Sequence, residues 1–320
     1  MRISLLTLAL VGCTDAKHGD TALEDVGSDA VDMRREFPAA PEGGLQLLPP
    51  EYTIPAFSEK QFCWFTRWDG EDIGINYQAT YQSNGGHHVV LMKTFADEDD
   101  FPDGTVFDCS DKNSLPMTDM EPIIFGRGIA SGGVGNESIL DLGATMAVNL
   151  DEGTRMIVQS HYLNPTPNAV LVNDAINLGL ISEDQVEIWA APFAHTVLEF
   201  EIPAGETATV DFDCTWEDDA TVLFLGGHMH DWGKAFSLDW TSGDTTERIY
   251  EIPEWTVEYR DRPPVNEYAD GDFTVAAGDV FSTSCTWDNT TDHTLGFPEE
   301  MCVTFGFAHE SKLPIICAPQ

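Results

Sequence analysis

From about Pro49 onward, the chain consists of short apolar or alternating runs separated by clusters of Gly, Pro, Asn and Asp. No long stretch keeps the 3.6-residue apolar period of an amphipathic helix. Many short strands between turns are typical of antiparallel β-sandwich or jelly-roll domains. We therefore expect an all-β protein. The expected strands include His88–Phe95, Thr154–His161, Val186–Ala191, Val197–Ile202, Thr221–Gly226 and Val303–Phe307.

The length of 320 residues is enough for two domains of ordinary size. A polar loop over residues 164–185 precedes the run at Val186–Ala191, and a turn at Pro203–Gly205 follows the next run. We therefore expect a boundary near Pro192. The prediction is two tandem β-sandwich domains, jelly-roll-like in character, over residues 49–191 and 192–320.

The N-terminus is typical of an exported protein. Residues 1–12 begin Met-Arg, continue with an apolar stretch and end before Cys13, which indicates a signal peptide. The sequence before Cys13 resembles a bacterial lipobox, so we expect Cys13 to be lipidated and to be the only membrane attachment, on the outer membrane or cell surface. Ordinary cleavage, giving a soluble secreted protein, is the alternative. Residues 13–48 are acidic and polar and are predicted to be a flexible tether.

Charge and cysteine content narrow the classes of function. The chain has 55 acidic and 15 basic side chains and a formal net charge of −40. This excludes nucleic acid as a partner, because phosphate binding needs clustered Lys and Arg. Beyond Cys13, six cysteines remain, and an even number in an exported chain predicts disulfides. Their spacing alone does not fix the pairing. No CxxC motif is present, which argues against a structural zinc site.

Five imidazoles and one thioether stand out as candidate ligands of soft metals. A thioether beside imidazoles favours copper over zinc, magnesium or calcium. The candidate ligands are His87, His88, His161, His228, His230 and Met301.

The spacing of these residues predicts two different local geometries. His228 and His230 are two residues apart, so on a strand they project from the same face, and with Met301 they make a three-ligand site that keeps an open position. His87 and His88 are adjacent and point to opposite faces of a strand. They reach one metal only at a bulge or a strand end, with His161 as a third ligand. The alternative for each histidine is a structural role.

The motifs follow one another in a characteristic order. In sequence they are His87-His88, His161–Pro165, His228–His230 and Glu300–Cys302. This order resembles the type II copper, ascorbate-dependent monooxygenases, which include peptidylglycine α-hydroxylating monooxygenase and dopamine β-monooxygenase. The resemblance covers roughly residues 50–320 and includes Gln159, the turn Pro203–Glu206 and Lys234.

The resemblance implies two β-sandwich domains that each hold one copper ion and face an interdomain cleft. His87, His88 and His161 would hold an electron-transfer copper, with Gln159 beside it. His228, His230 and Met301 would hold the copper that binds O2 and attacks a substrate C–H bond. Ascorbate or a similar one-electron donor would supply electrons. By the same resemblance the cysteines pair as Cys63–Cys109, Cys214–Cys317 and Cys285–Cys302.

The chain departs from the family at the substrate-binding positions. Gly226, Val303 and Phe305 stand where peptide-amidating members carry Arg, Asn and Tyr, and the Arg binds the substrate carboxylate. A peptidylglycine substrate is therefore not expected, and a neutral or amine-bearing small molecule fits better. Substrate identity and oligomeric state stay open. Two alternatives remain: a non-catalytic copper-binding envelope lipoprotein that stores, senses or passes copper, and a β-sandwich protein used only for surface interaction.

Overall fold

The computed structural model describes residues 30–110, 120–122, 137–261, 263–268, 271–297 and 299–318. Strands make up nearly all the regular structure in these ranges. The exceptions are the short helix α1 (Glu258–Asp261) and a 3-10 turn at Glu183–Gln185. The expectation of an all-β protein is confirmed. Among the described residues, no helix is long and apolar enough to cross a membrane.

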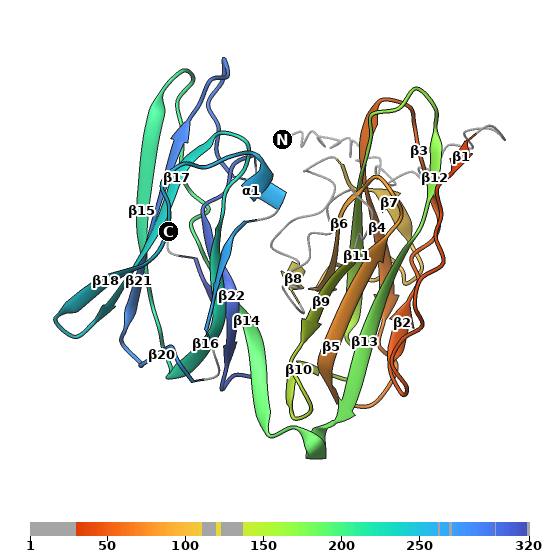
Figure 1. The fold of residues 1–320 in the computed structure, drawn as a ribbon, viewed down its shortest axis with the longest axis horizontal. Coiled ribbons are helices and arrows are strands. Elements are labelled where there is room, and N and C mark those ends of the chain that lie inside the picture. The colour runs from red at the N-terminus through yellow and green to blue at the C-terminus, as the bar shows by residue number, and fades with distance from the viewer. Residues whose placement is uncertain are drawn as a thin grey trace, which may run out of the picture.

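The first half of the chain contains a five-stranded sheet, part of an eleven-stranded sheet that continues into the second half, and a small three-stranded sheet (Figure 1). The first sheet, in the order β7-β4-β11-β6-β8, contains β4 (Ser58–Arg67), β6 (Gly86–Thr94), β7 (Val106–Asp108), β8 (Met120–Pro122) and β11 (Arg155–Asn164). The second contains β2 (Leu45–Leu47), β5 (Ile73–Gln82), β9 (Glu137–Asp141), β10 (Met146–Leu150) and β13 (Asp174–Ser182). The small sheet contains β1 (Val31–Asp32), β3 (Tyr52–Ile54) and β12 (Val170–Val172).

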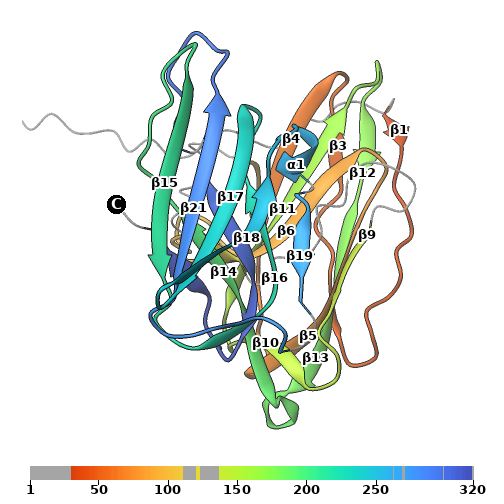
Figure 2. The same ribbon diagram turned by 60° about the vertical axis from the view of Figure 1, so that its left-hand side comes forward.

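The second half of the chain has an outer four-stranded sheet and an inner sheet, which continues the eleven-stranded sheet beyond β10. Figure 2 shows the outer one, with its four strands side by side in the order β15-β21-β17-β18. These are β15 (Thr207–Thr215), β17 (Gly233–Ser242), β18 (Thr245–Ile252) and β21 (Val280–Asp288). The inner sheet contains β14 (Ile188–Thr196), β16 (Ala220–His228), β19 (Val265–Glu267), β20 (Thr274–Val275), β22 (Val303–His309) and β23 (Ile315–Cys317).

Strand β14 joins the two halves. It pairs in parallel with β10 at Ile188 and Trp189, and it then pairs along its length with β22 and, from Phe193, with β23. Pro192, the predicted boundary, lies inside β14, in the gap between the β10 and β23 pairings. Proline has no backbone N–H to donate to a neighbouring strand. Pro192 is therefore best tolerated here, where the edge of β14 opposite β22 has no ladder partner.

Each half has its own apolar core. The core of the first half includes Leu91, Val158 and Ile176, which are fully buried. Phe224 of β16 and Phe307 of β22 stack with ring centroids 6.0 Å apart and belong to that same core, although they lie on the inner sheet of the second half. The two halves therefore pack through this aromatic pair as well as through the strand that joins them.

Three disulfides stabilise the sheets, one in the first half of the chain and two in the second. Cys63–Cys109 links β4 to the segment after β7. Cys214–Cys317 links β15 to β23, and Cys285–Cys302 links β21 to the residue before β22. The pairing that the copper-monooxygenase resemblance implies is confirmed at all six cysteines.

The predicted signal peptide, Cys13 and residues 14–29 of the predicted tether lie outside the described residues. The rest of the segment assigned to the tether, residues 30–48, contacts the folded body. Strand β2 pairs with β13, and Leu47 is buried. An acidic composition does not exclude these contacts, since single apolar residues such as Leu47 suffice to anchor an edge strand.

The predicted strand Val197–Ile202 is wrong. Strand β14 ends at Thr196, and from this run only Ile202 pairs, in an isolated bridge with Leu295. The alternation of apolar residues is present, but Leu198 is exposed while Val197 and Ile202 are buried. Residues 197–202 therefore form an irregular connection that is held by its two buried ends, and they do not pair as a β-strand.

Candidate metal centres

Three histidines of the first half bring their ring nitrogens to one point. The Nδ1 atom of His161 lies 3.0 Å from Nδ1 of His87 and 3.4 Å from Nδ1 of His88. One nitrogen from each ring lies within 4.8 Å of the other two. His161 is buried, while His87 and His88 are half-buried. The cluster thus contains one buried candidate ligand, His161, and two partly solvent-exposed ones, His87 and His88.

A β-bulge makes this convergence possible. In the pairing of β11 with β6, His161 faces His88 and Tyr162 faces Gly86, so His87 is the extra residue. A bulged residue turns its side chain away from the normal alternation. Gly85, just before the bulge, has a φ of +89°, which glycine adopts readily. Adjacent strand residues need a β-bulge to reach one metal ion, and the bulge predicted for His87 and His88 is present.

The donor set fits a metal ion. Imidazole nitrogens bind zinc at roughly 2.0–2.1 Å, so neighbouring ligand nitrogens in a tetrahedral or trigonal site lie about 3.3–3.6 Å apart. The two Nδ1 separations to His161 are 3.0 and 3.4 Å, close to that range. Three neutral imidazoles suit copper or zinc rather than magnesium or calcium.

Glu59 orients the buried histidine. Its Oε1 lies 2.7 Å from Nε2 of His161. When Nε2 carries the proton and donates it to this carboxylate, the lone pair is left on Nδ1, the atom that faces the other two histidines. Carboxylates commonly orient metal-binding histidines in this way. Sequence reasoning missed Glu59, because the contact depends on the pairing of β4 with β11, which spacing along the chain does not reveal.

Gln82 supports the same ligands through the backbone. Its fully buried side chain donates an Nε2–H to the carbonyl of His88 at 2.9 Å and lies 3.5 Å from the carbonyl of His161. Behind it lies Asp174, which accepts a hydrogen bond from the Tyr162 hydroxyl. A buried polar network thus connects β5, β11 and β13 directly behind the histidine cluster.

Asp174 predicts a pH dependence of stability. Burial raises the pKa of Asp174 to about 6, even though Ser160, Tyr162 and Gln82 act to lower it. An exposed Asp titrates near 3.9, so the folded protein holds this proton more tightly than the unfolded chain. The favourable contribution is complete below about pH 4 and is lost as the pH rises through 6.

The variant Asp174→Asn does not titrate and keeps an oxygen for the Tyr162 hydroxyl. Between pH 5.0 and 7.5, we expect the wild type to lose about 1.4 kcal/mol more unfolding free energy than Asp174→Asn. Urea titrations of both proteins at the two pH values measure this difference. Parallel pH profiles for the two proteins would show that Asp174 has an ordinary pKa.

The second group of ligands lies at the end of β16. The rings of His228 and His230 have centroids 5.0 Å apart and planes at 80°. Met229 between them is fully buried in the core of the second half. The two histidines therefore point to the opposite face, towards the first half, as the alternation in the sequence predicts.

Met301 follows Glu300, whose carboxylate accepts the backbone N–H of His230, so the two segments lie close together. The β16–β22 ladder ends at the His228–Val303 pair, and a place for Met301 opposite His230 stays a prediction from extending that register. Cys302 is fully buried and bonded to Cys285 on the core side. Met301 precedes it and is half-buried. Strand-like alternation would put its side chain on the same face as the two histidines, and this stays a prediction.

Glu300 holds the His230 segment against the strand that follows Met301. Its side chain is fully buried and accepts hydrogen bonds from the backbone N–H groups of His230 at 2.9 Å and Trp232 at 2.8 Å, and from the Trp287 indole at 2.8 Å. Burial raises the pKa of Glu300, and these three donors act against that rise. The sequence motif includes Glu300, but nothing in its spacing indicates this role.

The ring of His230 is fixed by a backbone contact. Its Nδ1 lies 2.9 Å from the carbonyl oxygen of Glu299. With the proton on Nδ1 donated to that carbonyl, Nε2 is left as the available ligand atom. The first group thus offers Nδ1 atoms, whereas His230 offers Nε2.

Gln159 lies two residues before His161 on β11 and is half-buried on the same face. It pairs across the sheet with Cys63 and Val90. Its place is compatible with a role near the first group, and that role stays a prediction.

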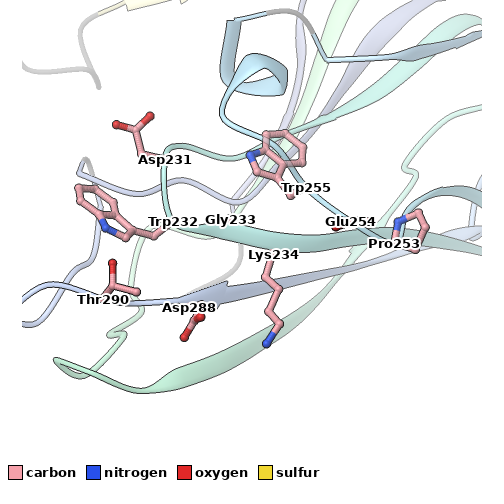
Figure 3. A pocket seen from close by; sticks show the side chains of 9 residues that line it. All are labelled: Asp231, Trp232, Gly233, Lys234, Pro253, Glu254, Trp255, Asp288 and Thr290. Atoms are coloured by element: carbon pink, nitrogen blue, oxygen red, sulfur yellow. The ribbon is translucent and has the colours of Figure 1, made fainter.

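A pocket of about 500 Å3 adjoins the turn after His230 (Figure 3). Trp255 closes one wall, and its indole N–H donates to the carbonyl of His230 at 3.1 Å. A Cβ atom on Gly233 would lie 2.6 Å from the Trp255 ring, so only glycine lets this ring approach. The pocket is lined by Asp231, Trp232, Gly233, Lys234, Pro253, Glu254, Trp255, Asp288 and Thr290.

Comparisons with known proteins give structural matches of low similarity. No family model and no curated protein matches the chain. The VP2 subviral particle of infectious bursal disease virus is 10% identical, with 83% of this chain and 71% of that chain covered and a TM-score of 0.19. The structure of the infectious bursal disease virus Gt strain is 9% identical, with 88% and 83% covered and a TM-score of 0.16. At such TM-scores these two structures carry no argument.

Proposed function

We propose that the protein is a copper-dependent monooxygenase that hydroxylates a C–H bond of a small molecule with O2 and an ascorbate-type reductant. The observation that carries the proposal is the convergence of His87, His88 and His161 through their Nδ1 atoms. A second group, His228 and His230 with Met301 on the same face, supports it. Two groups of soft ligands in separate halves suit two one-electron metal ions better than one structural ion.

Copper bound at the two groups would supply one-electron transfer and O2 activation. The residues of the chain supply position and protonation state. Glu59 keeps the lone pair of His161 on Nδ1, and the Glu299 carbonyl keeps that of His230 on Nε2. Met301, half-buried just before β22, would add a thioether, which favours the reduced ion. In the overall reaction, one oxygen atom enters the substrate and the other leaves as water, with two electrons from the reductant and two protons.

The cellular location follows from the sequence and is also part of the proposal. Three disulfides suit an oxidising compartment. We place the protein in the cell envelope, attached through lipidated Cys13, where copper and a small-molecule reductant have access to it.

A non-catalytic copper carrier is the second candidate. The three-histidine cluster on its own is sufficient to bind one copper ion, and it lies partly at the surface, where transfer to another protein is feasible. This candidate needs neither O2 nor a second ion.

Copper stoichiometry and oxygen consumption separate the two candidates. We expect the purified wild type to bind two copper ions, and His161→Ala and His228→Ala to bind one each. With ascorbate, the loaded wild type should couple O2 uptake to a hydroxylated product from a panel of small molecules, and neither variant should. Two bound copper ions without any coupled product across the panel would favour the carrier. No bound copper would reject both.

A further inference from the structure

Gln82 holds the two strands that carry the first ligand group. It is the last residue of β5, and its side chain reaches across to the five-stranded sheet, where Nε2 donates to the carbonyl of His88 at 2.9 Å and lies 3.5 Å from that of His161. His88 on β6 and His161 on β11 face each other in the ladder. A single amide group therefore contacts the backbones of two candidate ligands at once.

Gly86 provides the room in which this side chain lies. A Cβ atom at position 86 would be 2.6 Å from Cβ of Gln82, 2.7 Å from its Cδ and 2.9 Å from its Oε1. Non-bonded carbon atoms pack at about 3.5–4.0 Å, so any side chain at position 86 would displace Gln82 from its Cβ atom to its amide. We call this pair of residues the Gln82–Gly86 interlock.

The requirement for glycine at position 86 concerns space and not backbone conformation. Gly85, one residue earlier, has a φ of +89°, which favours glycine. Gly86 belongs to strand β6 and is not among the residues with a positive φ, so its backbone conformation is open to alanine. Outside the adjacent residues, the three atoms nearest to an added Cβ all belong to Gln82. An alanine at this position would therefore act on the interlock.

The interlock lies on both sides of the bulge residue His87. Gly86 comes directly before His87 and lies against the Gln82 side chain. His88 comes directly after His87, and its carbonyl accepts a hydrogen bond from Gln82. Because a bulged residue has no ladder partner of its own, its position depends on the residues that flank it. Gln82 therefore fixes the chain before and after His87.

Burial makes the Gln82 contact hard to replace. Gln82 is fully buried, and Asp174, which faces it across the β13–β5 ladder, is also buried. A buried amide that loses its carbonyl partner is not rehydrated and keeps the full desolvation penalty. The two strands that carry the histidines therefore cannot shift relative to β5 without an unfavourable loss of this bond.

We propose that the Gln82–Gly86 interlock preorganises the first ligand group, so that the Nδ1 atoms of His87, His88 and His161 converge before a metal ion binds. Gln82 is a positioning residue, since it contacts the backbone of the ligands and not their rings. A preorganised site loses less conformational entropy on binding than a mobile one, which raises its affinity for the metal. Copper as that metal rests on the proposed function, whereas the interlock is a property of the metal-free protein.

Two substitutions disturb the interlock in different ways. Gln82→Met keeps most of the side-chain volume and removes the amide, whereas Gly86→Ala keeps the amide and takes its space. In a His228→Ala background, which removes the second group, a chelator titration measures the Cu(I) affinity of the first group, and EPR reports its Cu(II) geometry. Both substitutions should weaken Cu(I) binding by about tenfold, in line with the loss of one or two hydrogen bonds, and should change the Cu(II) spectrum.

Gly74→Ala is the matched control. It adds a methyl group on the same strand β5, 2.7 Å from Cβ of the buried Ala147. This variant should lose stability without any change in Cu(I) affinity or in the Cu(II) spectrum. Gly86→Ala should have no further effect in a Gln82→Gly protein, because the Cβ, Cδ and Oε1 atoms that it would meet are then gone.

The outcomes separate the interlock from the proposed function. Wild-type affinity and spectrum in Gln82→Met, or the same loss from Gly86→Ala with and without Gln82→Gly, would overturn the interlock. If the protein binds no copper, the proposed function fails, and NMR of the histidine ring nitrogens in the metal-free protein decides the interlock. The ring-nitrogen shifts of His87, His88 and His161 should then change in Gly86→Ala and stay as they are in Gly74→Ala. The same response in both variants would reject the interlock.

Discussion

Glu300→Ala is expected to abolish copper binding at the His228–His230 group and to destabilise the protein by on the order of 4 kcal/mol. A hydrogen bond to a charged group contributes about 1.5–3 kcal/mol, and the alanine leaves three buried N–H donors without an acceptor. Two of these donors are the backbone amides of His230 and Trp232, so the turn that carries His230 loses its attachment to the Met301 segment. Urea unfolding and copper stoichiometry measure the two effects.

Glu299→Ala is the matched control for this prediction. Its side chain bonds the exposed ring of His293, at 3.0 Å, while its contact with His230 is made by a backbone carbonyl that the substitution keeps. An exposed pair of this kind contributes roughly 0–1 kcal/mol. Equal loss of stability and copper in both variants would show that Glu300 has no special positioning role.

Under the proposed function, Met301→Ala is expected to weaken Cu(I) binding at the second group by about 100-fold and to abolish substrate oxygenation, because one of the three proposed ligands is lost. The free energy of unfolding should change little, since the side chain is half-buried. A competition titration with a chromogenic Cu(I) chelator measures the affinity, and product formation measures the activity.

Met229→Ala is expected to show the opposite pattern, a loss of stability without a loss of Cu(I) affinity. Met229 lies on the other face of the same segment and is fully buried in the core of the second half. Truncating a buried methionine costs about 2–5 kcal/mol, so this variant should lose stability and keep its affinity for Cu(I). Normal activity in Met301→Ala would remove this residue from the proposed ligand set.

Local patterns in the sequence predict the strands and the direction of several side chains. Alternation places His228 and His230 on one face and Met229 on the other, and the adjacent His87 and His88 require the bulge that the strand pairing contains. Alternation fails at Val197–Ile202, because a run with buried ends also suits an irregular connection. The disulfide pairing came from the family resemblance, and spacing alone leaves it open.

The groups that orient the ligands were not predictable in the same way. Glu59, Gln82 and Glu300 act on histidines that are 70 or more residues away in sequence or on another strand. Their roles depend on which strands pair and in which register, and that is a property of the whole sheet. Local periodicity determines which face a side chain takes, but it does not determine its neighbour on the next strand.

The strand that joins the halves bears on how electrons pass between the two histidine groups. Because β14 is hydrogen-bonded to β10, and Phe224 and Phe307 are buried in the core of the first half, swinging the halves apart would break the β14–β10 ladder pairs and expose these two rings. Under the proposed function, electrons would pass between the two groups, and this packing would set the distance between them when the chain folds, whereas a flexible linker would leave that distance variable.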